Sequence, residues 1–145
     1  MSTPERNIQI MLEVFRAVER RDAQRMLDLV VPDVEFQWPP SLPYGGTRRG
    51  LNPEGPTWGK TWDALQPTAA ERNLSPRLIA ASETEVVVHW QQRGLTSAGD
   101  RIDTPVLGLY RLQDGKLARA QMFYFDPAAV LSFLAKAGNS ATASA

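Results

Sequence analysis

The sequence has no cysteine and a single histidine, His89. Without cysteine there are no disulfides, thiol nucleophiles or cysteine-ligated metals, and one histidine excludes a multi-histidine metal site. The carboxylates show no spacing that suggests a site of their own. We therefore expect no metal centre in this protein.

The sequence also lacks an excess of charge and any long apolar run. Sixteen Lys and Arg residues balance sixteen Asp and Glu residues, whereas a nucleic-acid binder normally has a basic excess. No apolar stretch approaches the roughly 18 residues of a membrane span, and the N-terminus has no apolar signal core. These absences predict a cytoplasmic protein that binds neither nucleic acid nor membrane.

The 145 residues fit one domain with a substantial core. The first third of the chain has the apolar spacing of two helices. Thr3 can cap the first helix and Pro4 suits its first position, while Asp22 starts the second helix and Pro32 ends it. Alternation over residues 34–38 then predicts a short strand.

Residues 39–59 are rich in proline and glycine. Such a stretch is neither a regular helix nor a central strand, so we expect a long structured loop. Trp58 and Trp62 are four residues apart, which favours a short helix through residue 65 with both indoles on one side.

The rest of the chain predicts an antiparallel meander and a final helix. The Asp114-Gly115 pair is a strong hairpin signal. The helix starts at Asp126-Pro127 and ends at Gly138, which leaves residues 139–145 as a disordered tail after a single domain, 1–138. The expected strands are Arg77–Ala81, Glu85–Gly94, 101–112 and Leu117–Phe125.

This order of elements resembles that of the nuclear-transport-factor-2-like proteins, which include SnoaL-like cyclases, ketosteroid isomerases and limonene-epoxide hydrolases. The resemblance covers about residues 5 to 137. Its most specific parts are the segments 105–117 and 123–126, which look like the last two strands of the epoxide-hydrolase branch. Residues 36–40 and Tyr44-Gly45 are similar to that branch's first strand and loop.

The resemblance implies an α+β fold, a cone-shaped barrel in which N-terminal helices pack over the concave face of a curved antiparallel sheet. Small apolar ligands would sit in the cone. It also implies a homodimer paired through the outer sheet face, where Val86, Val88 and Trp90 would form an apolar stripe.

The known catalytic residues of these relatives are not retained. The positions that match the isomerase residues hold Val14, Trp38 and Gly108, none of which transfers a proton. The positions that match the hydrolase residues look like His89, Gln91, Phe36, Trp38, and Met122 or Phe123. Both hydrolase carboxylates are missing.

His89 is the candidate general acid or base, since histidine is the natural proton carrier at physiological pH. Gln91 shares its strand face by the period of two, Tyr124 could donate its hydroxyl to a ligand, and Asp103 is a further catalytic candidate. The alternatives are a hydrogen-bonded core histidine, packing for Tyr124, and a surface ion pair of Asp103 with Arg93 or Arg101.

Aromatic side chains gather around the expected pocket. They favour an aromatic cage for a flat apolar ligand, although filling of the core explains them equally well. The candidate ligand-binding residues are Trp38, Tyr44, Trp58, Trp62, Phe36, Met122 and Tyr110.

Together these features predict a SnoaL-like enzyme that acts on a small apolar oxygenated metabolite by cyclase-, isomerase- or hydrolase-type chemistry. No cofactor is expected, because side chains alone can supply acid–base and positional catalysis. The alternative is a non-catalytic ligand-binding or accessory protein that uses the same pocket. Two or more titratable groups in the pocket would favour the enzyme.

Overall fold

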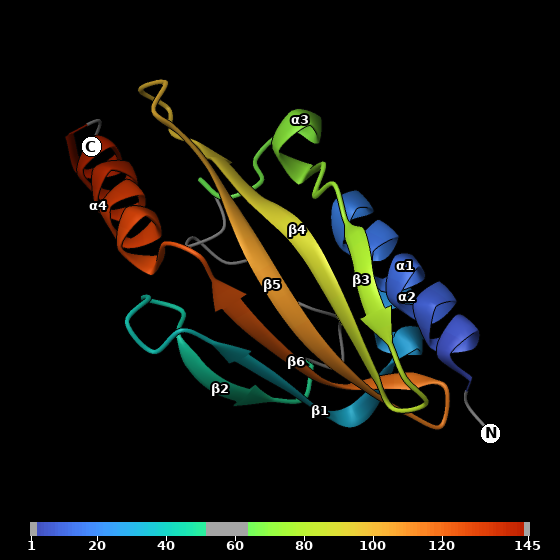
Figure 1. The fold of residues 1–145 in the computed structure, drawn as a ribbon. Coiled ribbons are helices and arrows are strands. Elements are labelled where there is room, and N and C mark those ends of the chain that lie inside the picture. Colours follow the sequence, from blue (N-terminus) through green and yellow to red (C-terminus); the bar gives the residue numbers. More distant parts are fainter. Residues whose placement is uncertain (1–2, 52–63, 144–145) are drawn as a thin grey trace.

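The computed structural model describes residues 3–51 and 64–143, which form a curved six-stranded sheet with helices at its sides (Figure 1). The strand order is β2-β1-β6-β5-β4-β3. The strands are β1 (Val30–Trp38), β2 (Gly46–Arg49), β3 (Arg77–Ala81), β4 (Glu85–Leu95), β5 (Arg101–Gln113) and β6 (Lys116–Tyr124). The described helices are α1 (Pro4–Arg20), α2 (Ala23–Leu29), α3 (Ala69–Arg72) and α4 (Pro127–Ala143).

The N-terminal helices form as their end signals predict. The Thr3 side chain accepts a hydrogen bond from the Arg6 amide at 3.1 Å, and Asp22 caps α2 through the Arg25 amide at 3.0 Å. These bonds satisfy amides that have no partner inside the helix. α1 contacts β3, β4 and β6, so it covers one face of the sheet, which we call the inner face.

The sheet is mixed, because β1 runs parallel to β6 while all other neighbours are antiparallel. β1 begins at Val30, so Pro32 lies within the strand, in a stretch where the pairing with β6 shifts register. The expected loop after β1 contains β2, an edge strand. The α+β fold class is confirmed, and the sheet differs from the expected antiparallel one in the single parallel pair of β1 and β6.

The C-terminal half matches the predicted hairpin and helix start. Asp114 and Gly115 both have positive φ, 51° and 78°, as a tight turn between β5 and β6 requires. The Asp126 carboxylate caps α4 by accepting a hydrogen bond from the Ala129 amide at 3.0 Å. The helix does not end at Gly138 as expected but runs to Ala143, since Gly138 lacks the positive φ of a helix-ending glycine.

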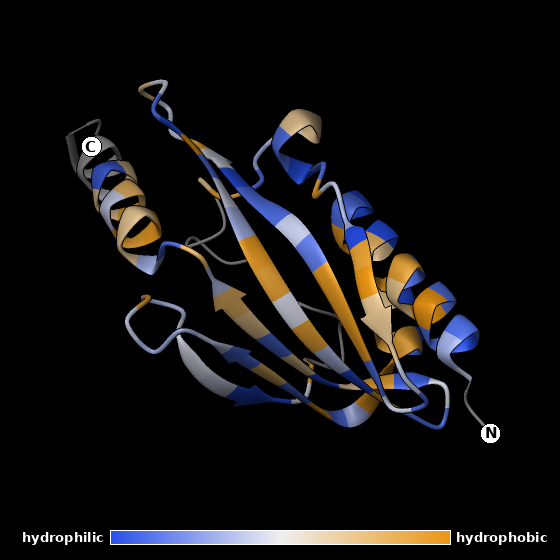
Figure 2. Cartoon of the chain, viewed as in Figure 1, coloured by the Kyte–Doolittle hydropathy of each residue, from blue (hydrophilic) through white to orange (hydrophobic). Residues whose placement is uncertain are grey.

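The two faces of β4 are the reverse of the sequence expectation. Val86 and Val88 are fully buried on the inner face and Trp90 is only 6% exposed, so they do not form an outer stripe. Apolar and polar residues alternate along β4 and β5 (Figure 2), and the larger apolar set of β4 faces the helices. The outer face instead exposes Leu107 and Phe123.

No helix within the described residues is long and apolar enough to cross a membrane.

Candidate functional site

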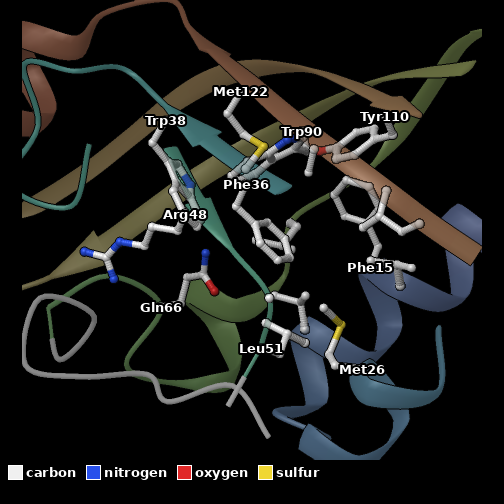
Figure 3. Close-up of a pocket in the computed structure, with 16 residues that line it drawn as sticks. Phe15, Met26, Phe36, Trp38, Arg48, Leu51, Gln66, Trp90, Tyr110 and Met122 are labelled. Atoms are coloured by element: carbon white, nitrogen blue, oxygen red, sulfur yellow. The ribbon is translucent and has the colours of Figure 1, made fainter. Parts of the chain in front are cut away.

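A cavity of about 260 Å³ lies between the N-terminal helices and the inner face of the sheet (Figure 3). Among the residues that the structure describes, its wall is mainly apolar, and the polar side chains are Arg48, Gln66, Trp90 and Tyr110. Its described lining residues are Val14, Phe15, Val18, Met26, Phe36, Trp38, Arg48, Gly50, Leu51, Gln66, Leu74, Trp90, Tyr110, Leu117, Ala120 and Met122.

Aromatic rings give the cavity flat walls. Phe36 and Trp38 are alternate residues of β1, and their rings stack with centroids 5.5 Å apart and planes 13° apart. Phe15 on α1 meets Trp90 and Tyr110 edge to face, at 6.2 and 5.8 Å. Such walls suit a planar ligand, because aromatic rings pack by offset stacking and edge-to-face contact.

Four of the expected ligand-binding residues line the cavity: Phe36, Trp38, Tyr110 and Met122. The register of β6 is thereby settled, since Met122 faces inward and Phe123 is 51% exposed on the outer face. Tyr44 and Tyr124 are buried but are not part of the described cavity wall.

Trp58 and Trp62, the remaining expected ligand-binding residues, lie outside the described residues. At the end of their expected helix, Leu65 instead forms an isolated bridge to Gly94 of β4.

The catalytic candidates His89, Gln91 and Asp103 do not line the cavity. His89 and Gln91 alternate with the buried residues Trp90 and Gln92, so they lie on the outer face of β4. Their expected position inside the cone is wrong, because the even-numbered residues of β4 lie on its inner face and the odd-numbered ones on its outer face. Asp103 forms an ion pair with Arg93 at 3.3 Å, the surface alternative considered above.

A chain of buried hydrogen bonds runs beside the cavity. The Tyr44 and Tyr124 hydroxyls are 2.7 Å apart, and Gln92 Nε2 donates to the Tyr124 hydroxyl at 3.2 Å. Gln66 Nε2 donates to Gln92 Oε1 at 2.8 Å, and Arg21 Nη1 donates to Gln66 Oε1 at 3.0 Å. The chain thus connects the end of α1 to the segment before β2, through one residue of the cavity wall.

Sequence reasoning missed Arg21, Gln66 and Gln92. Gln92 could have been found as a polar residue on the apolar face of β4. No feature of the sequence marks Arg21 or Gln66. In the structure both residues have a positive φ, 55° and 58°, which is uncommon outside glycine. Their bond holds together two residues with costly backbone conformations.

Burial shifts the pKa values of the groups around the cavity. It raises the pKa of Tyr44 and Tyr110 well above the ordinary value of 10, and that of Tyr124 to about 12. The nearby Tyr124 raises the pKa of Tyr44 further. For Tyr110, the Trp90 N–H acts in the opposite direction and lowers the pKa. That N–H still lacks a partner in good hydrogen-bond geometry. All three phenols are therefore neutral at physiological pH.

Burial also lowers the pKa of Arg21 to about 10, with the neighbouring Arg72 guanidinium adding to the shift. Arg21 stays protonated at neutral pH, so it serves the hydrogen-bond chain as a donor only.

Gly108 creates the space that the Tyr110 hydroxyl occupies. A Cβ atom at position 108 would lie 2.2 Å from the Tyr110 hydroxyl oxygen, so any side chain there would displace the ring. Residues 108 and 110 are neighbours on the inner face of β5, and the phenol leans along the strand toward the glycine. The Tyr110 phenol thus occupies the space on the cavity wall that a side chain at position 108 would otherwise fill.

The polar side chains of the cavity wall can donate hydrogen bonds. None of its described lining residues is Asp, Glu or His, so this described part of the wall has no side chain that titrates near neutral pH. Likewise, the described residues include no group of three potential metal ligands among His, Cys, Asp and Glu.

Solved structures share this fold. A protein of unknown function with a cystatin-like fold from Xanthomonas campestris is 22% identical, with a TM-score of 0.70 over 88% of this chain and 96% of that chain. TerC, co-crystallised with polyporic acid, is 22% identical, with a TM-score of 0.65 over 89% and 98%. A putative polyketide cyclase from X. campestris pv. campestris is 16% identical, with a TM-score of 0.70 over 90% and 98%.

No functionally curated protein matches the sequence. The sequence model of the SnoaL-like domain matches residues 11–120, which include most of the cavity wall. This match spans more than half of the chain and agrees with the cystatin-like and NTF2-like folds of the similar structures. The chain therefore belongs to the SnoaL-like domain family.

Proposed function

We propose that the cavity binds a small, planar, largely apolar metabolite that carries oxygen. The observation behind this proposal is an aromatic-walled cavity of about 260 Å³ with a few polar side chains, the usual composition of a small-molecule site. A further support is that TerC, a protein of similar fold, was co-crystallised with polyporic acid.

A cavity-filling variant tests the proposal. Ala120 lies on the cavity wall, so Ala120→Phe would occupy the space of the ligand. Ala80→Phe on exposed β3 adds the same side chain away from the cavity and is the matched control. We expect isothermal titration calorimetry with naphthalene probes to show at least about tenfold weaker binding for the first variant only. A folded Ala120→Phe protein that binds as tightly as wild type would contradict the proposal.

A second candidate is an enzyme of the cyclase or isomerase type. It is favoured by the neutral Tyr110 phenol on the cavity wall and by the similar fold of a putative polyketide cyclase. A buried phenol can donate a hydrogen bond to an oxygen that gains negative charge during the reaction. If so, Tyr110→Phe lowers turnover about a hundredfold or more while ligand affinity changes little. A Tyr110→Phe protein with full turnover would exclude this role.

We also propose a homodimer formed through the outer face of the sheet. Leu107 and Phe123 are register partners on that face and are 42% and 51% exposed, a costly arrangement for a neutral protein in water. Light scattering should give twice the chain mass, and Phe123→Asp should give the monomer. A wild-type monomer at tens of micromolar would contradict this proposal.

A further inference from the structure

The described polar groups of the cavity wall donate hydrogen bonds or carry positive charge. Arg48 is the only formally charged side chain among the described lining residues. Gln66 adds an amide, and the neutral Tyr110 adds a hydroxyl. Arg48 lies at one end of the cavity and Tyr110 at the other (Figure 3).

The amide of Gln66 keeps an N–H that it can donate to a ligand. Arg21 has no acceptor atom, so the Gln66 atom 3.0 Å from it must be the carbonyl oxygen, Oε1. Nε2 then donates one hydrogen to Gln92 and retains a second hydrogen. Arg21 is thus a positioning residue: it fixes which end of the Gln66 amide is the oxygen and which is the nitrogen.

Arg48 lines one end of the cavity and has no counter-ion among the described residues. In the antiparallel pair of β1 and β2, Arg48 lies opposite Phe36, and opposite residues share a sheet face. Its neighbour Arg49 lies opposite Glu35 and forms an ion pair with it at 3.8 Å. No described carboxylate is within ion-pair distance of Arg48.

We infer that the ligand is an anionic aromatic compound whose negatively charged oxygen binds Arg48 and Gln66, while its rings lie between the aromatic walls. This inference rests on the proposed binding function and narrows it to one class of ligand. The charge of the wall favours an anion, and the fixed donor of Gln66 favours an oxygen acceptor over a cationic group. Phe36 lies opposite Arg48 in the strand pair and stacks on Trp38, so these two aromatic side chains would contact the rings of the ligand.

Three probes of similar shape separate charge from apolar contact: 2-naphthoate, 2-naphthamide and 2-naphthylmethylammonium. Titration calorimetry should show 2-naphthoate binding about tenfold more tightly than the amide, with the ammonium weakest. The preference should diminish at high ionic strength, because Arg48 lies on an exposed edge strand.

Arg48→Gln should weaken binding of 2-naphthoate about fivefold or more and leave 2-naphthamide within about twofold. Arg49→Gln is the matched control, since it removes the same charge from the adjacent residue on the outer face. Gln66→Glu keeps a partner for Arg21 but replaces the donor by a carboxylate, so it should also weaken naphthoate binding selectively.

The outcomes distinguish this inference from the function on which it rests. Equal binding of acid and amide, unaffected by Arg48→Gln, would overturn the anionic ligand and leave the cavity as a binding site. Tighter binding of the ammonium probe would overturn it as well. If none of the three probes binds, the proposed binding function itself fails.

Discussion

The burial of every tyrosine predicts an abnormal response to alkaline pH. The chain has three tyrosines, and Tyr44, Tyr110 and Tyr124 are only 3%, 5% and 8% exposed. Burial removes water from the phenolate and thus raises the pKa of each group. We expect that no tyrosine of the folded protein ionises near pH 10.

The size and sign of the effect follow from linkage between ionisation and folding. The pKa of each tyrosine is higher in the folded than in the unfolded protein. The contribution of these groups to the free energy of unfolding is therefore complete below about pH 10 and is lost as the pH rises. For Tyr124 this loss occurs between about pH 10 and its folded pKa of about 12. Each tyrosine lowers the free energy of unfolding by about 1.4 kcal/mol per pH unit in its window, so three that titrate together lower it by about 4 kcal/mol per pH unit.

Arg21 opposes this trend in part, because its folded pKa is lowered rather than raised. The tyrosine effect is larger, since three groups contribute to it. A domain of typical stability, about 5–15 kcal/mol, should therefore unfold within a few pH units above 10.

The assay follows phenolate absorbance and far-ultraviolet circular dichroism through one alkaline titration. Absorbance should stay flat past pH 10 and then rise steeply as helical signal is lost, whereas protein unfolded in guanidinium should titrate near pH 10. Each Tyr→Phe variant should remove about one third of the absorbance change. Phenolate that appears near pH 10 with the dichroism unchanged would refute the reasoning.

Three substitutions test the packing and the hydrogen bonding inside the protein. Gly108→Ala should cost about 1–3 kcal/mol in urea unfolding by displacing Tyr110, and an unchanged midpoint would contradict the expected clash of the added Cβ with the Tyr110 side chain. Gly94→Ala should destabilise at least as much, since its Cβ would lie 2.7 Å from both Ala64 O and the Phe133 ring. Arg21→Ala should cost about 1–3 kcal/mol by leaving Gln66 Oε1 without this donor, and Arg20→Ala serves as the control.

Much of the fold could be predicted because local chemistry specifies it. The Thr3 and Asp126 caps and the tight turn at Asp114-Gly115 depend on residues at most three apart, and each was confirmed. The strand Arg77–Ala81 has the predicted bounds, and the others differ by a few residues. Phe36 and Trp38 both line the cavity. Alternation predicts only that the two residues share one face of β1, whereas their place at a pocket was implied by the family resemblance.

The sequence alone determined the elements, the caps and the α+β class, since backbone preferences and apolar periodicity act over a few residues. Only the tertiary structure decided which face of β4 is inside, because alternation defines two faces without saying which one the helices cover. It excluded His89 from the cavity wall and brought Tyr44 to Tyr124, 80 residues apart in sequence. Hydrogen bonds and space-filling contacts between distant segments depend on how the whole sheet curves, and no local pattern records that curvature.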